Sequence, residues 1–393
     1  MKEHDFDEWV SRVGTDSYKW DYEGNGGSCI PLGVADTDYR IPREAVEAMR
    51  KVLDHGIFGY GHFPQERFAS AVRGWYLRRH DVKLEKEWIC HAPGLMTGAL
   101  WIILQAYTKP GDKVVVQSPV YNTFHKVIEK QGHHVINNEL ILEDGKYRID
   151  FEDLEQKASD PAVRILLLCS PHNPVGRVWT YEELLRYASI AKKTNTLIVS
   201  DEIHSDIVYE NHKYTPFYKL PDEYTEYAIV MGSPSKAFNV AALYTSYVLI
   251  KNKALREQFE VVSSQFHLDY NIFGIEAFVA CYNYCDYYVD QQREYLWGNI
   301  SVVRSFLAEK LPNVKMIEPE GTYLLWLDLR ELGLEQEELL HIFEKAKVKV
   351  NNGENYGGSG KGFVRMNVAT QKNVLTEALE RIARVMYGEG YYA

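Results

Sequence analysis

Three polar residues follow three apolar runs of this chain, and their side-chain types suit one chemistry. Asn173 follows the run 164–169, Asp201 follows 197–200, and Lys236 follows 228–231. A lysine amine can form an imine with a carbonyl compound, and a carboxylate can keep a ring nitrogen protonated. Alone, each would more often be a surface lysine, a helix cap or a loop turn, so the prediction depends on their occurring together.

The elements that must position these residues are buried strands alternating with helices. Apolar runs at 113–117, 164–169, 197–200, 228–231 and 246–250 are typical of strands buried on both faces of a mostly parallel sheet. Between them, 181–194 has helical periodicity, with Thr180 and Glu183 spaced as a capping box. The alternation predicts a doubly wound α/β domain, whose ligands bind at the carboxyl ends of the strands.

The rest of the chain predicts a second, smaller unit. Helical patterns near 287–309, 336–345 and 373–386 alternate with strand-like runs at 321–328 and 363–367. We expect a large domain over 45–285. We expect a small α+β domain made of 1–44 and 286–393.

Composition excludes several classes of protein. The chain has 393 residues and a formal net charge of −11, which argues against nucleic-acid binding. No apolar run is long enough to span a membrane, and the start lacks a secretory signal. Five scattered cysteines without metal-ligand spacing predict a reduced, cytoplasmic protein without a metal site.

Three motifs together resemble one known family. These are SPHNPVGRVWT at 170–180, SDEIHSDIVY at 200–209 and GSPSKAFNVAAL at 232–243. In this order and spacing they resemble fold-type I pyridoxal 5′-phosphate (PLP) enzymes, which have the aspartate-aminotransferase fold, and the similarity extends from residue 31 to about 379. Segments such as PLGVADTDY at 31–39 and GSGKGFVRMNVAT at 358–370 resemble the cystathionine β-lyase-like C–S lyase branch of the class I/II aminotransferases.

The resemblance implies roles for named residues. Lys236 resembles the lysine that binds PLP as an imine and acts as the catalytic base, and Asp201 the partner of the pyridine nitrogen. Arg365 resembles the arginine that holds the substrate carboxylate, together with Asn173. Other positions resemble residues that contact the ring or the phosphate: Asn173, His204, Tyr121, Leu95, Met96, Thr97, Ser233 and Ser235. A helix start at Leu95 would favour the phosphate on physical grounds alone.

Tyr60 resembles a tyrosine that reaches the phosphate from a second subunit. The resemblance therefore implies a homodimer with shared active sites, in which Tyr60 and Tyr121 belong to the catalytic set.

Two positions depart from the pattern of the C–S lyase branch, and a third departs only from the general aminotransferase pattern, as that branch also does. Gly33 stands where a tryptophan is common, and Thr37 where a methionine is common, in a segment expected to line the substrate entrance. Losing the indole should open space beside the substrate. Tyr244 stands eight residues after the lysine, where aminotransferases have an arginine, which favours a lyase.

The resemblance thus favours a PLP-dependent C–S β-lyase that converts an S-substituted L-cysteine, such as cystathionine, to a thiol, pyruvate and ammonia. An aminotransferase would use the same residues and is the first alternative. A PLP-binding regulatory protein is the second, although no appended nucleic-acid-binding module supports it.

Overall fold

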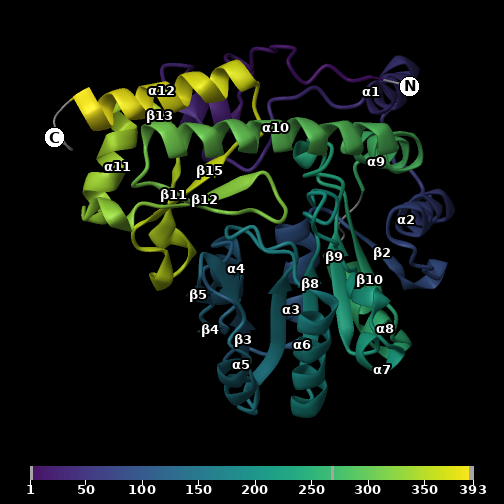
Figure 1. Cartoon of the computed structure of the whole chain (residues 1–393). Coiled ribbons are helices and arrows are strands. Elements are labelled where there is room, and N and C mark those ends of the chain that lie inside the picture. The colour runs from purple at the N-terminus through teal and green to yellow at the C-terminus, as the bar shows by residue number, and fades with distance from the viewer. Residues whose placement is uncertain (1–2, 267–269, 389–393) are drawn as a thin grey trace.

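A seven-stranded sheet forms the lower part of the molecule in Figure 1, a computed structural model that describes residues 3–266 and 270–388. Its strand order is β2-β10-β9-β8-β7-β3-β4. β4, β3, β7, β8 and β9 are parallel neighbours, whereas β10 is antiparallel to both β9 and β2. The strands are β2 (Ile89–Ala92), β3 (Lys113–Val116), β4 (His134–Asn137), β7 (Val163–Cys169), β8 (Leu197–Asp201), β9 (Ala228–Gly232) and β10 (Ser246–Ile250). The predicted mostly parallel α/β sheet is confirmed.

Both faces of this sheet are covered, because side chains of a strand alternate between its faces. Leu166 and Leu168 of β7 belong to one apolar cluster with Leu184 of α6. Ile165 and Leu167 belong to the other, which includes residues of α3 and α8. The helices of this part are α1 (Arg43–His55), α2 (Gln65–His80), α3 (Trp101–Tyr107), α4 (Thr123–Lys130), α5 (Phe151–Ala158), α6 (Tyr181–Thr194), α7 (Asp222–Thr225), α8 (Lys253–Gln265) and α9 (Ile272–Tyr284).

α6 shows how local sequence sets the bounds of a helix. Thr180 accepts from the Glu183 N–H, and the Glu183 carboxylate accepts from the Thr180 N–H, so the predicted capping box is confirmed. Asn195 ends the helix in the left-handed conformation. Because both ends are fixed by adjacent residues, the helix occupies the predicted range.

A four-stranded antiparallel sheet forms the second part, with order β11-β12-β15-β14. Its strands are β11 (Lys315–Ile317), β12 (Leu324–Asp328), β14 (Asn351–Asn352) and β15 (Phe363–Asn367). The helices α10 (Asp286–Lys310), α11 (Gln336–Lys345) and α12 (Lys372–Gly388) accompany it, and α10 and α12 run across the top of Figure 1. The strand β1 (Ile30–Pro31) pairs in parallel with β13 (Val348–Lys349), which brings the N-terminal segment against this part. β5 (Ile141–Glu143) and β6 (Lys146–Arg148) form a separate hairpin.

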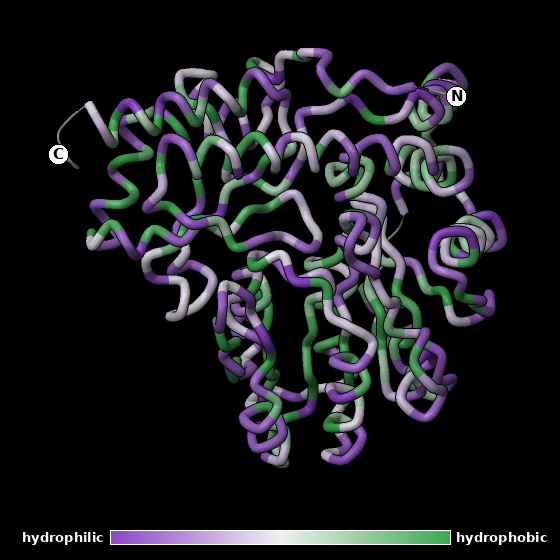
Figure 2. Tube along the Cα trace, viewed as in Figure 1, coloured by the Kyte–Doolittle hydropathy of each residue, from purple (hydrophilic) through white to green (hydrophobic). Residues whose placement is uncertain are grey.

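Apolar residues concentrate along the strands, and hydrophilic residues concentrate at the outer ends of the helices (Figure 2). In the described ranges, no helix combines the length and the apolar character that a membrane crossing needs.

Candidate active site

A cavity of ≈ 350 Å³ opens at the carboxyl ends of β7, β8 and β9. This is where a parallel sheet is expected to bind ligands. Most of the predicted site residues line it, namely Leu95, Met96, Thr97, Tyr121, Asn173, Asp201, His204, Ser233, Ser235 and Lys236. The topology therefore brings residues from distant parts of the chain to one place.

Lys236 lies in the loop that follows β9 and points its amine into this cavity. Its Nζ donates to the carbonyl oxygen of Ala35 at 2.7 Å. Burial lowers the pKa of Lys236 to about 8, and the charge of Arg365 acts in the same direction, whereas Asp36 and Asp201 act against it. A buried lysine of this kind is neutral more often than a surface lysine, so it can act as a nucleophile or a base.

Asp201 ends β8 and is almost fully buried. Its Oδ1 accepts from the Ile203 N–H at 3.1 Å. Burial raises the pKa of Asp201 to about 7, although the Ile203 N–H and the charge of Lys236 oppose the rise. A cationic nitrogen placed against this carboxylate would stabilise its charged form, so the group suits a protonated ring nitrogen.

Arg365, on β15, approaches the cavity from the second sheet. Its Nη1 donates to Asn173 Oδ1 at 3.0 Å, and its Nη2 donates to the Gly33 carbonyl at 2.7 Å. Its buried Nε has no hydrogen-bond partner among the described residues. An anion would satisfy this donor, because a buried unpaired N–H is unfavourable.

His204 is also buried, and its Nδ1 has no hydrogen-bond partner within the part of the chain that the structure describes. Burial lowers the pKa of His204 well below its usual value, and the charges of Lys236 and Arg365 add to that effect. The ring is therefore neutral, and it lies edge-on to Tyr323 with centroids 5.9 Å apart.

The helical turn predicted at Leu95 is present as a π-helical segment, Leu95–Leu100, that continues into α3. Gly94 precedes it with φ +78°, a conformation that favours glycine. A Cβ at Gly98 would lie 2.4 Å from the Pro93 carbonyl oxygen, so glycine is required there too. Leu95, Met96 and Thr97, the first residues of this turn, line the cavity, and the first N–H groups of a helix suit a phosphate.

The two predicted serines are placed differently. Ser235 lines the cavity with its backbone N–H donating to Ser233 Oγ at 3.2 Å. The Ser233 hydroxyl itself donates to the Thr245 carbonyl at 2.8 Å, so it already has an acceptor inside the protein.

Four predicted residues are not in the cavity lining. Arg365 reaches it through Asn173, as described above. Thr37 is fully buried, and its backbone N–H and carbonyl both bond to the Asn239 side chain. Gly33 adjoins Arg365 through its carbonyl oxygen. Tyr60 is fully exposed in the loop between α1 and α2.

The open space expected beside Gly33 is absent. A Cβ at this position would lie 2.8 Å from Asn351 Oδ1, and Asn351 Nδ2 donates to the Gly33 carbonyl at 3.1 Å. The side chain of Asn351 therefore fills the direction in which an indole would project.

Sequence reasoning missed two groups in the cavity, the Ala35 carbonyl and Cys169. A backbone acceptor has no side-chain signature, so only its place within PLGVADTDY could have pointed to it. Cys169 ends β7 in register with Asp201, and burial raises the pKa of its thiol. Tyr244 also lines the cavity, with a left-handed φ of 48°. In the described part of the chain, no cluster of His, Cys, Asp or Glu could hold a metal ion.

The donor set fits PLP on observations of this structure. The cavity offers an amine, a buried carboxyl without a cationic partner other than Lys236, and a helix start suited to an anion. The unpaired Nε of Arg365 adds a site for a substrate carboxylate. Fold and cavity together define a PLP-dependent enzyme of fold type I.

The chain belongs to the aminotransferase class I and II family, whose model matches residues 28–382. It is 41% identical to cystathionine beta-lyase PatB of Bacillus subtilis over 382 residues, which cover 96% of this chain and 98% of the relative. Cystalysin of Treponema denticola, solved with PLP, is 33% identical with a TM-score of 0.95, covering 99% of this chain and 100% of that one. The PLP-bound C–S lyase of Staphylococcus hominis is 28% identical with a TM-score of 0.92, covering 98% and 99%.

Proposed function

We infer that this chain is a PLP-dependent C–S β-lyase that cleaves S-substituted L-cysteines. The observation that carries the inference is the meeting of Lys236, Asp201 and Asn173 in one cavity, with Arg365 bonded to Asn173. Relatives named as cystathionine β-lyase and C–S lyase cover nearly the whole chain.

The site residues divide between cofactor and substrate. Lys236 would attach PLP, Asp201 would hold the pyridine nitrogen, and Asn173 and His204 would face the ring oxygen. Tyr121 would stack on the ring. The N–H groups of 95–97 and the hydroxyl of Ser235 would hold the phosphate. Ser233 would position Ser235, because its Oγ accepts from the Ser235 N–H. Bound PLP supplies a conjugated ring that withdraws electrons from Cα of the amino acid.

Lys236 and Arg365 would perform the steps that protein side chains contribute, namely proton transfer and binding of the substrate carboxylate. Arg365 binds the substrate carboxylate through its free Nε, which fixes Cα near the lysine. The neutral Nζ of Lys236 then takes the proton from Cα as a general base, which its lowered pKa favours. The resulting ammonium, or Tyr121, returns a proton to the sulfur as the Cβ–S bond breaks.

The overall reaction balances with water as the co-reactant. R–S–CH₂–CH(NH₃⁺)–COO⁻ and water give R–SH, pyruvate and NH₄⁺.

A homodimer with shared sites is part of this proposal. Large apolar side chains are exposed at the end of α1, in the following loop and at the start of α9, namely Leu53, Ile57, Phe58, Tyr60 and Ile272. A second copy covering them would bury area that a soluble monomer rarely exposes, and it would give Tyr60 a partner.

Two further expectations stay with the proposal. None of the five cysteines, all of which lie in the described residues, forms a disulfide, which supports a location in the reducing cytoplasm. The division into a large domain over 45–285 and a small one from 1–44 and 286–393 is also proposed; 1–2, 267–269 and 389–393 lie outside the described residues.

The test is pyruvate and thiol release from purified protein with PLP and L-cystathionine, without any keto-acid acceptor. Stoichiometric pyruvate and thiol would support a β-lyase. Amino transfer that begins only when an α-keto acid is added, with no thiol release, would overturn the lyase and establish an aminotransferase. Lys236→Ala serves as the blank for non-enzymatic release.

A further inference from the structure

A short irregular segment, residues 33–38, has bends at 34–36 and at 38, passes beside the cavity and is here called the strap. Successive carbonyls of the strap have different hydrogen-bond partners. The Gly33 carbonyl accepts from Arg365 Nη2 at 2.7 Å. The Ala35 carbonyl accepts from Lys236 Nζ at 2.7 Å and from the Tyr323 hydroxyl at 3.0 Å. The strap thus contacts both proposed reactive side chains, Lys236 and Arg365.

Asn367, two residues beyond Arg365, holds the two carbonyls that alternate with those of Gly33 and Ala35. Its Nδ2 donates to the carbonyls of Val34 and Asp36, each at 2.6 Å. Asn239, three residues beyond Lys236, donates to the Thr37 carbonyl at 2.9 Å and accepts from its N–H at 3.2 Å. The strap is therefore tied to the strand of Arg365 and to the loop of Lys236.

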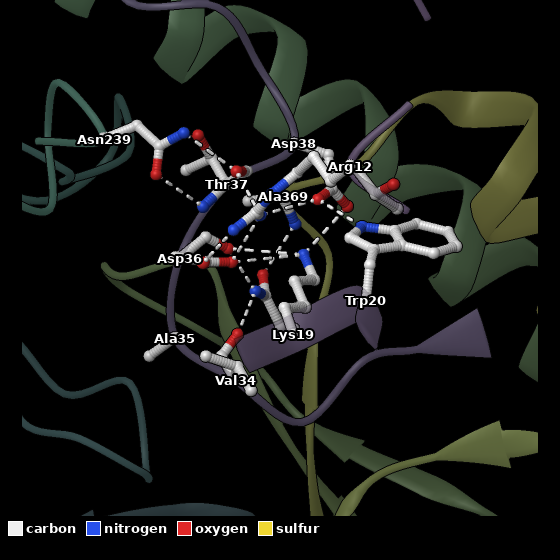
Figure 3. Close-up of polar contacts among 12 residues, drawn as sticks. Arg12, Lys19, Trp20, Val34, Ala35, Asp36, Thr37, Asp38, Asn239 and Ala369 are labelled. Atoms are coloured by element: carbon white, nitrogen blue, oxygen red, sulfur yellow. Dashed lines mark hydrogen bonds and ion pairs between the residues drawn. The ribbon is translucent and has the colours of Figure 1, made fainter. Parts of the chain in front are cut away.

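The end of the strap carries two carboxylates in an ion-pair network with Arg12 and Lys19 (Figure 3). Lys19 is fully buried and lies 2.8 Å from Asp38 Oδ2 and 3.6 Å from Asp36 Oδ1. Arg12 binds Asp36 at 2.7 Å through Nη2 and Asp38 at 3.0 Å through Nη1. The Trp20 indole donates to Asp38 at 2.8 Å.

The network combines two cationic side chains with two carboxylates, so its net charge is zero. Burial alone would raise the pKa of Asp38, but Lys19, Trp20 and Arg12 hold it below its usual value. Removing one partner would leave a buried charge uncompensated, which forces the segment to move. None of Arg12, Lys19, Asp36 and Asp38 lines the cavity.

We propose that Arg12, Lys19, Asp36 and Asp38 are positioning residues, which lock the strap so that its Ala35 and Gly33 carbonyls orient Lys236 and Arg365. The proposal rests on the function proposed above and deepens it. These four residues act through the backbone and touch neither substrate nor cofactor.

The network also affects the pKa of Lys236, through the negative charge of Asp36. Asp36 raises the pKa of Lys236, as does Asp201, whereas Arg365 and burial lower it, and the facing ring of His204 is neutral. Neutralising Asp36 therefore makes protonation of the Lys236 nitrogen less favourable. A role in packing alone would not produce this effect.

The first experiment is a pH titration of the visible absorbance of bound PLP, which reports protonation at the Lys236 nitrogen. Asp36→Asn is expected to move the midpoint to lower pH. Asp36→Glu, which keeps the charge, should stay near wild type, and so should Lys193→Met, which removes an exposed lysine paired with Glu155. The titration needs bound PLP but no turnover, so its outcome stands whichever reaction the enzyme catalyses.

The second experiment measures kcat per PLP-loaded site and thermal stability. Lys19→Met is expected to lower kcat about tenfold or more, because small displacements at a reacting centre are costly. Lys19→Met/Asp38→Asn removes both charges, so it should recover stability while kcat stays low; it also replaces the single variant if that one does not fold. Variants that lose only stability, with the absorbance midpoint unchanged and kcat within about twofold of wild type, would overturn the proposal.

Discussion

Arg365 lies on the four-stranded sheet and Asn173 in a loop of the seven-stranded sheet, yet Nη1 of the arginine donates to Oδ1 of the asparagine at 3.0 Å. Arg365 belongs to β15, and Asn173 follows β7. This bond orients the amide so that its Nδ2 is left to donate elsewhere in the cavity. It also couples the proposed carboxylate-binding group to a proposed cofactor contact.

Arg365→Lys should raise KM for an S-substituted cysteine roughly 30-fold, with a much smaller change in kcat. A lysine keeps a charge but loses the planar fork that serves Asn173, Gly33 and the substrate together. Steady-state kinetics with L-cystathionine would measure both constants. Arg330→Lys, at an exposed arginine paired with Asp328, is the matched control. An unaltered KM would rule out the carboxylate role.

Lys236→Ala should abolish covalent attachment of PLP and lower turnover at least about 10³-fold, because both the imine-forming amine and the general base are lost. Borohydride reduction followed by peptide mass spectrometry detects the attachment site. Wild type should carry the cofactor mass on the peptide that contains residue 236, and the variant should not.

Lys193→Ala is the control for this substitution, since Lys193 is an exposed lysine on α6. It should leave attachment and turnover unchanged. Cofactor mass on a peptide without residue 236, in wild type, would refute the assignment of Lys236.

The elements and most of the cavity could be predicted because their signals are local. The strand before Lys236 is a continuous apolar run, and α6 is bounded by its own capping residues. Parallel strands then place their following loops at one edge, which brings Asp201 and Lys236 together. Here pattern and topology agree, and only the side-chain roles needed the family resemblance.

The strap could not be predicted, because its contacts are non-local and partly made by backbone. The Ala35 carbonyl meets Lys236 across 201 residues of chain. The expected space beside Gly33 depended on what approaches it, and the sequence does not reveal that Asn351 projects there. The glycine at position 33 therefore reflects the close approach of Asn351 and does not mark an open space beside the substrate.

Asp206→Asn should change how stability depends on pH. Burial raises the pKa of Asp206 to about 6, although Arg79 and the Trp75 indole act against the rise. The folded state therefore holds this proton more tightly than the unfolded chain, and its contribution to stability is lost as pH rises from about 4 to above 6. Asparagine, which is always neutral, escapes that loss.

The difference in unfolding free energy between Asp206→Asn and wild type should therefore shift in favour of the variant by roughly 2 kcal/mol when the pH is raised from 4 to 7. Urea unfolding at both pH values would measure it. The neighbouring His80, whose pKa burial lowers to about 3, is present in both proteins, so its contribution cancels. A difference between variant and wild type that is flat across this range would contradict a raised pKa for Asp206.

Mixing two inactive variants should restore activity if the active sites are shared between subunits. Tyr60 is fully exposed and absent from the cavity lining of its own chain, whereas Lys236 lies within the cavity. Tyr60→Ala and Lys236→Ala subunits, refolded together, would form hybrid dimers in which one site has both intact residues. Statistical mixing then predicts about a quarter of wild-type activity.

Size-exclusion chromatography with light scattering should show the dimer. Tyr181→Ala, at an exposed tyrosine on α6, is a control that should retain activity without mixing. If mixing restores nothing although hybrid dimers form, Tyr60 serves its own chain or no site at all, and the shared-site dimer is wrong.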